Sequence, residues 1–127
     1  LKWADEMIKR DVKIISLADT VGVAMPEQIS FALQTLIPKY PQATIGVHLH
    51  STPENWKEKL TAAINAGCTR VDGALKGIGG CPMAGNALVG NMNTEQMIPF
   101  LEEKNLLQNL NKEALHKSLR LASEIFV

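Results

Sequence analysis

Apolar and polar residues follow two different spacings along the chain, and each spacing predicts one kind of secondary structure. Residues 12–17 and 44–49 are short, mostly apolar runs, as is typical of strands buried in a parallel sheet. A third strand is predicted at 69–74, directly after Gly67, a candidate helix C-cap. Elsewhere apolar residues recur every three or four positions, which predicts helices with one face packed on the sheet. The predicted helices span 1–9, 26–38, 52–66, 94–103 and 112–126.

The order of these elements predicts an α/β fold made of parallel β/α units. Strands that alternate with helices run parallel, with right-handed crossovers between them. The carboxyl ends of such strands meet at one edge of the sheet, where α/β proteins build their sites. Polar or glycine-rich residues follow each predicted strand here: Asp19 and Thr20, the histidines of 48–50, and the loop 76–93. Three such strand ends in a row fit an opened (β/α)₈ barrel better than a complete small fold.

Composition narrows the classes of partner. The 127 residues carry 13 basic and 13 acidic side chains, so no basic stripe is present to bind nucleic acid. No apolar run reaches the ~20 residues that a membrane-spanning helix needs. The two cysteines, Cys68 and Cys81, make no disulfide framework and indicate a reducing compartment. The chain begins at Leu1 within a helical pattern, as a piece of a longer protein would.

Two histidines at the end of the second predicted strand are the strongest candidates for chemistry. Side chains alternate between the faces of a strand, so His48 and His50 are expected on the same face. Two imidazoles side by side supply half of a metal site. Two other interpretations stay open at this point. Either both are polar residues on an exposed edge strand, or one is buried and hydrogen-bonded beside an exposed one.

Asp19 and Cys81 are further candidates, each with a structural alternative. Asp19 follows the first strand, where a site is expected, but its carboxylate also suits capping of the following turn. Cys81 lies in a glycine-rich loop, where a thiol is more exposed than the usual buried cysteine, and this favours catalysis over packing. Other conspicuous residues are assigned to packing (Cys68, Trp3 and Trp56) or to the surface (His116).

Four motifs occur in order along the chain. They are Ser-Leu-Ala-Asp-Thr-Val-Gly-Val at 16–23, Val-His-Leu-His-Ser-Thr at 47–52, Gly-Ile-Gly-Gly-Cys-Pro at 77–82 and Gly-Asn-Met-Asn-Thr-Glu at 90–95. Together they resemble the 3-hydroxy-3-methylglutaryl-CoA (HMG-CoA) lyase family, within the metal-dependent aldolase-type barrels that include isopropylmalate and citramalate synthases. The cysteine of the third motif discriminates most, because the synthases lack it. The resemblance covers nearly the whole chain and implies the last three strands of a TIM (β/α)₈ barrel.

The resemblance implies a metal-dependent carbon–carbon lyase. It places a divalent cation, Mg²⁺ or Mn²⁺, on His48, His50 and Asn91. It implies cleavage of HMG-CoA to acetoacetate and acetyl-CoA, with Cys81 as proton donor to the thioester enolate and Asp19 as a functionally important aspartate. The resemblance also implies a role in leucine degradation and a location in a bacterial cytoplasm or a mitochondrial matrix. It implies a homodimer or a larger assembly.

Three features depart from the family pattern. Ser51 stands where the family usually has Asp, which changes the hydrogen bonds around the histidines. Lys76 replaces a small apolar residue, and either contacts a phosphate or carboxylate or is simply solvated. The segment 81–91 is one residue longer than in typical lyases, so Asn86 competes with Asn91 as the ligand. The residues that flank Asn91 favour Asn91.

Other family residues have no counterpart in this chain. The first strand of the family's barrel supplies an Arg-Asp pair, the arginine for catalysis and the aspartate as a metal ligand, and a later strand supplies a glutamate. Those strands would precede Leu1, so residues 1–127 are expected to be the C-terminal portion of one barrel domain. Such a barrel usually has ~250 residues. We expect this portion alone to have an incomplete metal shell, no turnover and two unpaired sheet edges.

Two other functions compete with the lyase. One is a related 2-oxo-acid aldolase, or a citramalate- or isopropylmalate-type synthase, in which Cys81 is incidental. The other is a non-catalytic α/β binding module that carries a His-x-His pair. Substitution of Cys81 by Ser separates the first from the lyase, and a divalent-ion titration separates the second.

Overall fold

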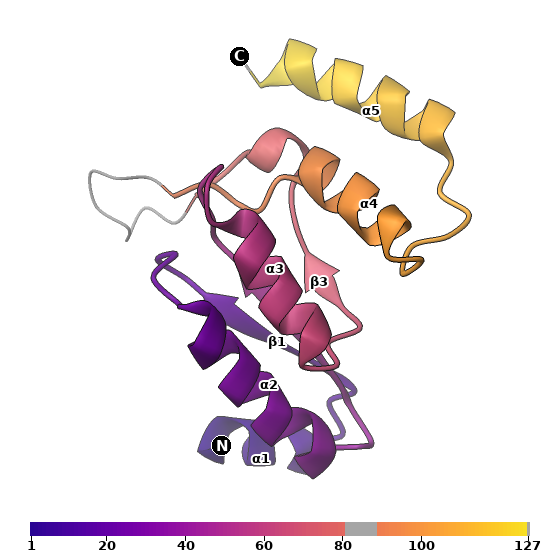
Figure 1. The fold of residues 1–127 in the computed structure, drawn as a ribbon. Coiled ribbons are helices and arrows are strands. Elements are labelled where there is room, and N and C mark those ends of the chain that lie inside the picture. The colour runs from indigo at the N-terminus through magenta and orange to yellow at the C-terminus, as the bar shows by residue number, and fades with distance from the viewer. Residues whose placement is uncertain (81–88, 127) are drawn as a thin grey trace.

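The chain folds into a three-stranded parallel sheet with the two connecting helices packed on one face, as the computed structural model shows for residues 1–80 and 89–126 (Figure 1). The sheet order is β1-β2-β3, with β1 at Ile14–Asp19, β2 at Thr44–Leu49 and β3 at Val71–Asp72. Helices α2 (Pro26–Lys39) and α3 (Trp56–Asn65) connect consecutive strands, which confirms the predicted order. The other elements are α1 (Lys2–Lys9), the short 3-10 helix η1 (Leu75–Gly77), α4 (Thr94–Glu103) and α5 (Lys112–Ile125).

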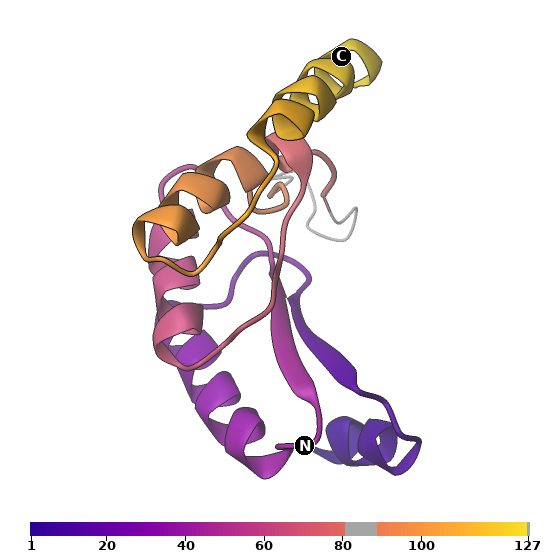
Figure 2. The same cartoon turned by 90° about the vertical axis from the view of Figure 1, so that its right-hand side faces the viewer.

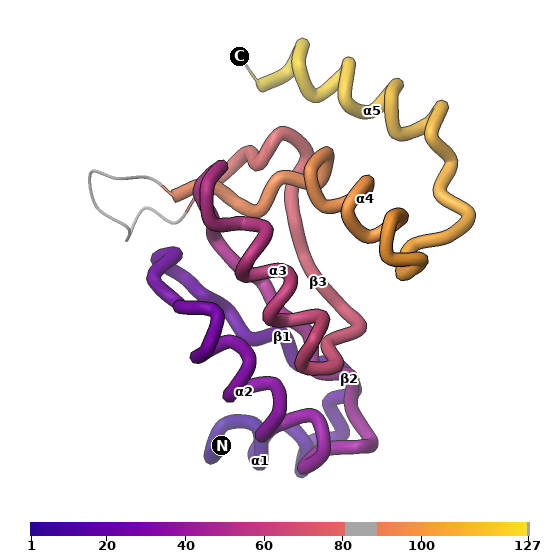
Figure 3. Tube along the Cα trace, viewed as in Figure 1, coloured from indigo at the N-terminus to yellow at the C-terminus, as the bar shows by residue number. Residues whose placement is uncertain are grey.

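Parallel pairing aligns the two longer strands residue by residue. Ala18 lies opposite His48 and Asp19 opposite Leu49, so β1 and β2 end at the same edge of the sheet. Figure 2 shows α2 and α3 on the same side of these strands. In the trace of Figure 3, α1 and α5 lie at opposite ends of the molecule. The histidine end of β2 is therefore next to the carboxyl end of β1.

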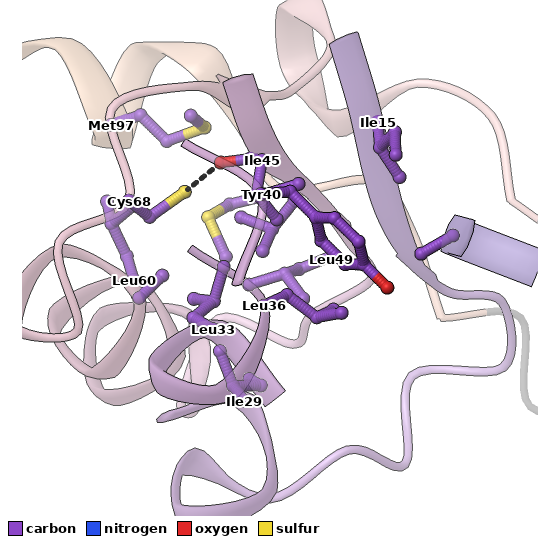
Figure 4. Packing of buried hydrophobic residues seen from close by; sticks show 14 of the residues in the cluster. Ile15, Ile29, Leu33, Leu36, Tyr40, Ile45, Leu49, Leu60, Cys68 and Met97 are labelled. Carbon is purple, nitrogen blue, oxygen red and sulfur yellow. Dashed lines mark hydrogen bonds between the residues drawn. The ribbon is translucent and has the colours of Figure 1, made fainter. Parts of the chain in front are cut away.

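The core lies between the sheet and the helices α2 and α3. Alternation along β2 turns Ile45, Val47 and Leu49 toward the helices, where all three are buried. Leu33 of α2 and Leu60 of α3 belong to the same cluster, and both are 0% exposed (Figure 4). The histidine of β2 lies on the opposite face of the sheet.

Two of the strands have boundaries that differ from the prediction. The first strand runs from Ile14 to Asp19 rather than over 12–17, because its last two residues continue the ladder with β2. The third strand is Val71–Asp72 rather than 69–74, because these two residues pair with β2 and the chain then turns into η1. The first difference places Asp19 inside a strand, which decides the direction of its side chain.

Helix boundaries also differ, by one residue at four ends and by four residues at the start of α3. α3 begins at Trp56 rather than at Thr52, because the intervening residues form a turn. In this turn the Thr52 N–H donates to Asn55 Oδ1 (2.8 Å) and the Glu54 N–H to Thr52 Oγ1 (3.3 Å). Side chains that bond nearby main-chain groups in this way favour turns over helix interiors. The last helix ends at Ile125 rather than at 126.

The predicted roles of Gly67 and Trp56 are confirmed, and that of Trp3 is wrong. Gly67 has φ +87°, and its N–H donates to a carbonyl of α3 at 2.9 Å, which is the geometry of a glycine C-cap. The ring of Trp56 meets Phe100 edge-on, with 5.8 Å between the centroids. Trp3 is 77% exposed, because α1 buries the neighbouring Ala4 instead.

The two outer strands are open edges in the described part of the chain. β1 and β3 each pair there with β2 alone, as expected. Open strands present unpaired main-chain groups to which further strands can add. Across residues 1–80 and 89–126, none of the helices combines the length and apolarity needed to cross a bilayer.

Candidate metal centre

His48 and His50 line the same open pocket at the carboxyl end of β2. The two rings meet edge-on, with 5.3 Å between their centroids and 88° between their planes. His48 is half-buried and His50 is buried. The pocket has a volume of about 400 Å³ and is lined by Ala18, Thr20, His48, His50, Gly79, Gly80 and Asn91. The strand therefore presents both imidazoles to one space.

The ring of His50 is held in one tautomer. Its Nδ1 lies 2.9 Å from the main-chain oxygen of Asp19. A carbonyl oxygen accepts hydrogen bonds and cannot donate them, so Nδ1 carries the proton. Nε2 of the neutral ring then keeps its lone pair, which is the usual arrangement of a metal-binding histidine.

Asn91 lines the same pocket. Its main chain forms an antiparallel bridge with His50. Nδ2 donates to the main-chain oxygen of Ile78 at 2.8 Å, and this contact determines which way the amide faces. Oδ1 is buried and has no hydrogen-bond partner in the described structure. Buried polar atoms without a partner are rare, and such an atom commonly marks the place of an ion or a water molecule.

The glycines of residues 77–80 allow the chain to close around Asn91. Gly79 has φ +88°, a left-handed conformation, and a Cβ at this position would lie 3.0 Å from Asn91 Nδ2. The Asn91 N–H donates to the Gly79 carbonyl at 3.1 Å. Gly77 is equally close, because a Cβ there would lie 2.9 Å from the Asn91 main-chain oxygen. The glycine-rich motif therefore holds the amide at the pocket.

The donor atoms at this pocket fit a divalent cation. Two imidazole nitrogens and one amide oxygen form the mixed set that suits Mn²⁺ or Mg²⁺. Asn91 Oδ1, which has no partner among residues 1–80 and 89–126, favours such an ion, because a cation would satisfy it. His, Cys, Asp and Glu side chains form no cluster of three or more in residues 1–80 and 89–126 that would hold a metal by itself. The pocket thus offers a partial, neutral ligand set, which substrate or other oxygens would complete.

Asp19 lies beside this pocket, but its carboxylate faces away from it. Because Asp19 belongs to β1, its side chain lies on the opposite face from that of Ala18, which lines the pocket. The buried carboxylate accepts hydrogen bonds from Lys59 Nζ (2.8 Å) and from the Ala24 N–H (3.2 Å), which is the turn-capping alternative. The Asp19 carboxylate therefore contacts Lys59 and the turn, and not the pocket where a catalytic role was expected. The main-chain oxygen of Asp19 is the atom that contacts the His50 ring.

Lys59 is a further residue of the site, for which the sequence pattern gives only a weak indication. It lies on α3, and 3% of the residue is exposed. Leu60 and Ala63 mark the buried face of this helix, and Lys59 falls on the same face. Lysine is almost never fully buried without a partner, so a lysine inside an apolar stripe indicates a buried acceptor.

Two other sequence candidates, Lys76 and Ser51, are not among the residues that line the pocket. Cys81 and Asn86 lie outside the described residues, so the role of Cys81 as proton donor stays a prediction. The Lys76 side chain is exposed, and its main-chain N–H donates to both carboxylate oxygens of Glu95, at 3.0 and 2.8 Å. This agrees with the solvated alternative for Lys76. Ser51 is buried next to His50 in the chain, and its N–H donates to the Gly90 carbonyl at 3.1 Å.

Cys68 is expected to resist alkylation in the folded protein. Burial raises the pKa of the Cys68 thiol, and Sγ lies 3.1 Å from the Arg70 carbonyl. It also lies 3.7 Å from the Ile45 carbonyl, the contact drawn in Figure 4. A thiol with a raised pKa forms little of the reactive thiolate at pH 8. Peptide mapping after iodoacetamide treatment at pH 8 should find Cys68 unmodified until guanidinium is added. Rapid labelling of the folded protein at Cys68 would contradict this.

Comparison with known proteins shows where the chain belongs. The HMGL-like family model matches residues 1–122. Hydroxymethylglutaryl-CoA lyase YngG of Bacillus subtilis is 29% identical over 124 residues, which are 98% of this chain and 41% of that protein. (R)-citramalyl-CoA lyase of Chloroflexus aurantiacus is 40% identical over 84 residues, which are 66% of this chain and 26% of that protein. Further relatives include HMG-CoA lyases named cytoplasmic in rat and mitochondrial in human.

A solved structure shows the same relationship in three dimensions. An HMG-CoA lyase of Acinetobacter baumannii, in complex with coenzyme A and 3-methylmalate, is 31% identical with a TM-score of 0.80. The match covers 96% of this chain and 40% of that one. The chain spans about two fifths (41%) of the B. subtilis relative and covers only part of the TIM barrels it resembles. The chain therefore belongs to the HMGL-like family, as a set of parallel β/α units of a lyase-type TIM barrel.

Proposed function

We propose that the full-length protein is a metal-dependent carbon–carbon lyase that cleaves HMG-CoA to acetoacetate and acetyl-CoA. In this proposal residues 1–127 are the C-terminal portion of its barrel domain. Membership of the HMGL-like family supports a lyase-like enzyme. The observation that carries the proposal is that His48, His50 and Asn91 line one pocket, and that Asn91 Oδ1 has no hydrogen-bond partner among the described residues. The hydroxyl and carboxylate oxygens of a 3-hydroxy acid are suitable ligands to complete the shell of a hard cation.

Three side chains of this chain would hold the ion. His50 is oriented by the main-chain oxygen of Asp19, and Asn91 by that of Ile78, so both would present their donor atoms in a defined direction. His48, on the same face of β2, would add the second nitrogen. When bound, Mg²⁺ or Mn²⁺ supplies Lewis-acid polarisation of the substrate oxygens.

The proposed reaction balances without an oxidant or a reductant. A base takes the proton of the 3-hydroxyl group, and the bond between carbons 2 and 3 breaks. The oxygen becomes the ketone of acetoacetate, and carbon 2 leaves as the enolate of acetyl-CoA. We assign the proton that this enolate takes up to the Cys81 thiol, since a free thiol has a pKa of ~8.5 and is mostly protonated at neutral pH.

A second substrate is favoured by the relative that is named (R)-citramalyl-CoA lyase, 40% identical over 84 residues. Citramalyl-CoA also carries a tertiary hydroxyl on carbon 3 of a CoA thioester, and the same bond cleavage gives pyruvate and acetyl-CoA. The two substrates differ by one methylene between carbon 3 and the carboxylate. A pocket discriminates one methylene by only ~1–3 kcal/mol, so both substrates belong in the test.

Incubation of the full-length protein with HMG-CoA and Mg²⁺ or Mn²⁺ tests the proposal. We expect acetoacetate and acetyl-CoA in equal amounts, and loss of both products when a chelator is added. Pyruvate from citramalyl-CoA, without acetoacetate from HMG-CoA, would instead select the second substrate.

The competing functions are tested with the same full-length protein and other substrates. A citramalate- or isopropylmalate-type synthase would release free CoA when it is given acetyl-CoA and a 2-oxo acid. It would cleave neither HMG-CoA nor citramalyl-CoA. A 2-oxo-acid aldolase would cleave its own substrate regardless of Cys81. A binding module would show neither turnover nor divalent-ion binding that depends on His48 and His50.

The remaining expectations are proposals that follow from the family. A CoA thioester is the proposed ligand, and a relative crystallised with coenzyme A supports it. A homodimer or larger assembly, a bacterial cytoplasm or mitochondrial matrix, and a place in leucine degradation are proposed on the resemblance. Residues 1–127 alone are expected to be inactive, since the part of the chain that the structure describes offers only part of a metal shell.

A further inference from the structure

Lys59 and Asp19 form a buried ion pair directly behind the histidines. Lys59 Nζ lies 2.8 Å from Asp19 Oδ2, and the two side chains are 3% and 5% exposed. The other ion pairs in the described part of the chain join side chains that are each at least 29% exposed. A buried pair is not a general stabilising device, because desolvation of the two charges offsets much of their attraction. The position of this pair therefore calls for an explanation beyond stability.

The ammonium of Lys59 joins three segments that meet at the pocket. Besides Asp19, Nζ donates to the Gly22 carbonyl at 2.9 Å and to the His50 carbonyl at 3.0 Å. An ammonium has three donors, so these contacts use all of them. The acceptors lie at the end of β1, in the turn that follows it, and at the residue after β2. Lys59, reaching from α3, thus connects the structural elements around the His50 backbone.

Asp19 connects Lys59 to the ring of His50. Its carboxylate accepts from Lys59, while its main-chain oxygen accepts the Nδ1 proton of His50 at 2.9 Å. His50 is consequently held at two points, by Lys59 at its carbonyl and by Asp19 at its ring. These contacts determine both the tautomer of the ring and the place of its backbone.

We propose that Lys59 and Asp19 act as a positioning pair that presents Nε2 of His50 to a divalent cation. The inference rests on the proposed function, because it presumes that His50 is a metal ligand. Neither charged group touches the substrate. Their effect is on His50, whose ring would otherwise sample both tautomers and a wider range of positions. Partners that orient a ligand in this way typically contribute about 10- to 100-fold in metal affinity.

The test compares the full-length wild-type protein with the double variant Asp19→Leu/Lys59→Met. Apolar residues of similar volume remove both charges together, so no unpaired charge stays buried. The main-chain oxygen at position 19 is retained in this variant, which isolates the effect of the charged pair. We expect thermal unfolding to remain cooperative and Mn²⁺ affinity, measured by electron paramagnetic resonance, to fall by about 10-fold or more. In ¹⁵N-histidine NMR of the metal-free protein, the His50 ring should change from one tautomer to a mixture, because without the charged pair the main-chain oxygen of residue 19 is no longer held in place against Nδ1.

The matched control removes a lysine–aspartate pair far from the pocket. In Asp5→Leu/Lys39→Met the lost pair has 3.1 Å between Lys39 Nζ and Asp5 Oδ1, with both side chains 42% exposed. This control should keep the wild-type Mn²⁺ affinity and His50 spectrum. If the apolar double variant does not fold, Asp19→Asn/Lys59→Gln takes its place under the same criterion.

Each outcome decides the proposal. A folded variant with wild-type Mn²⁺ affinity and an unchanged His50 spectrum would overturn it and leave the pair a purely structural role. A wild-type protein that binds no Mn²⁺ through His50 would overturn the metal site and this inference together. Because Mn²⁺ binding and the NMR spectrum need no turnover, failure to cleave HMG-CoA does not affect either readout.

Discussion

Replacement of His50 by Ala in the full-length protein is expected to lower kcat/KM for HMG-CoA cleavage by about 10³-fold or more. The substitution removes one of three proposed ligands, and a polarising ion contributes several kcal/mol of transition-state stabilisation. His48→Ala should have the same effect, since the two rings line one pocket. Steady-state kinetics at a fixed Mn²⁺ concentration, together with Mn²⁺ binding by the same variants, measures both consequences.

The third histidine of the chain supplies the control for this prediction. His116 lies exposed on α5, so His116→Ala should keep wild-type kinetics and Mn²⁺ affinity. Asn91→Ala should weaken Mn²⁺ binding as well, because it removes the buried Oδ1 that has no other partner in the described structure. A His50→Ala enzyme within tenfold of wild-type kcat/KM at the same Mn²⁺ concentration would contradict the proposed ligand set.

Replacement of Cys81 by Ser is expected to lower kcat by about 10²- to 10⁴-fold, the usual contribution of a positioned proton donor. A serine hydroxyl is a much weaker acid than a thiol, so it would protonate the enolate poorly. Mn²⁺ affinity should stay at the wild-type value, because Cys81 is not among the proposed ligands. The combination of slow turnover and intact metal binding distinguishes this variant from His50→Ala.

Cys68→Ala is the matched control for the second prediction. Cys68 is 7% exposed and belongs to the hydrophobic core, so its loss should affect stability slightly and turnover little. Near-normal HMG-CoA cleavage by Cys81→Ser would remove Cys81 from the mechanism. In that case a cysteine-independent aldolase or synthase becomes the better description of the protein.

Regular patterns predicted most of the elements. β2 occupies 44–49 as expected, because a continuous apolar run with a polar end is a strong signal for a buried parallel strand. The helix starts at Pro26 and Thr94 were also correct, since Pro at a first turn and Asn before a helix act locally. Signals that span a few neighbouring residues do not depend on the rest of the fold.

Boundaries that depend on pairing were harder to predict. The sequence predicts Asp19 as a polar residue that follows a strand, yet it pairs opposite Leu49 and belongs to β1. The strand at 69–74 is shortened to Val71–Asp72 by the partner residues that β2 offers. Side chains alternate along a strand, so the inclusion of Asp19 in β1 puts its carboxylate on the buried face, opposite to Ala18.

The sequence by itself determined the α/β class, the parallel order of the units and the placement of His48 and His50 on one face of a strand. These follow from short-range periodicity, since a strand repeats every two residues and a helix every 3.6. Only the tertiary structure decided that Asn91 joins the histidines with an unpartnered oxygen in the described structure, and that Lys59 reaches Asp19 from a distant helix. Such contacts join residues about 40 positions apart (Asp19 and Lys59). They depend on how the elements pack, which local spacing does not encode.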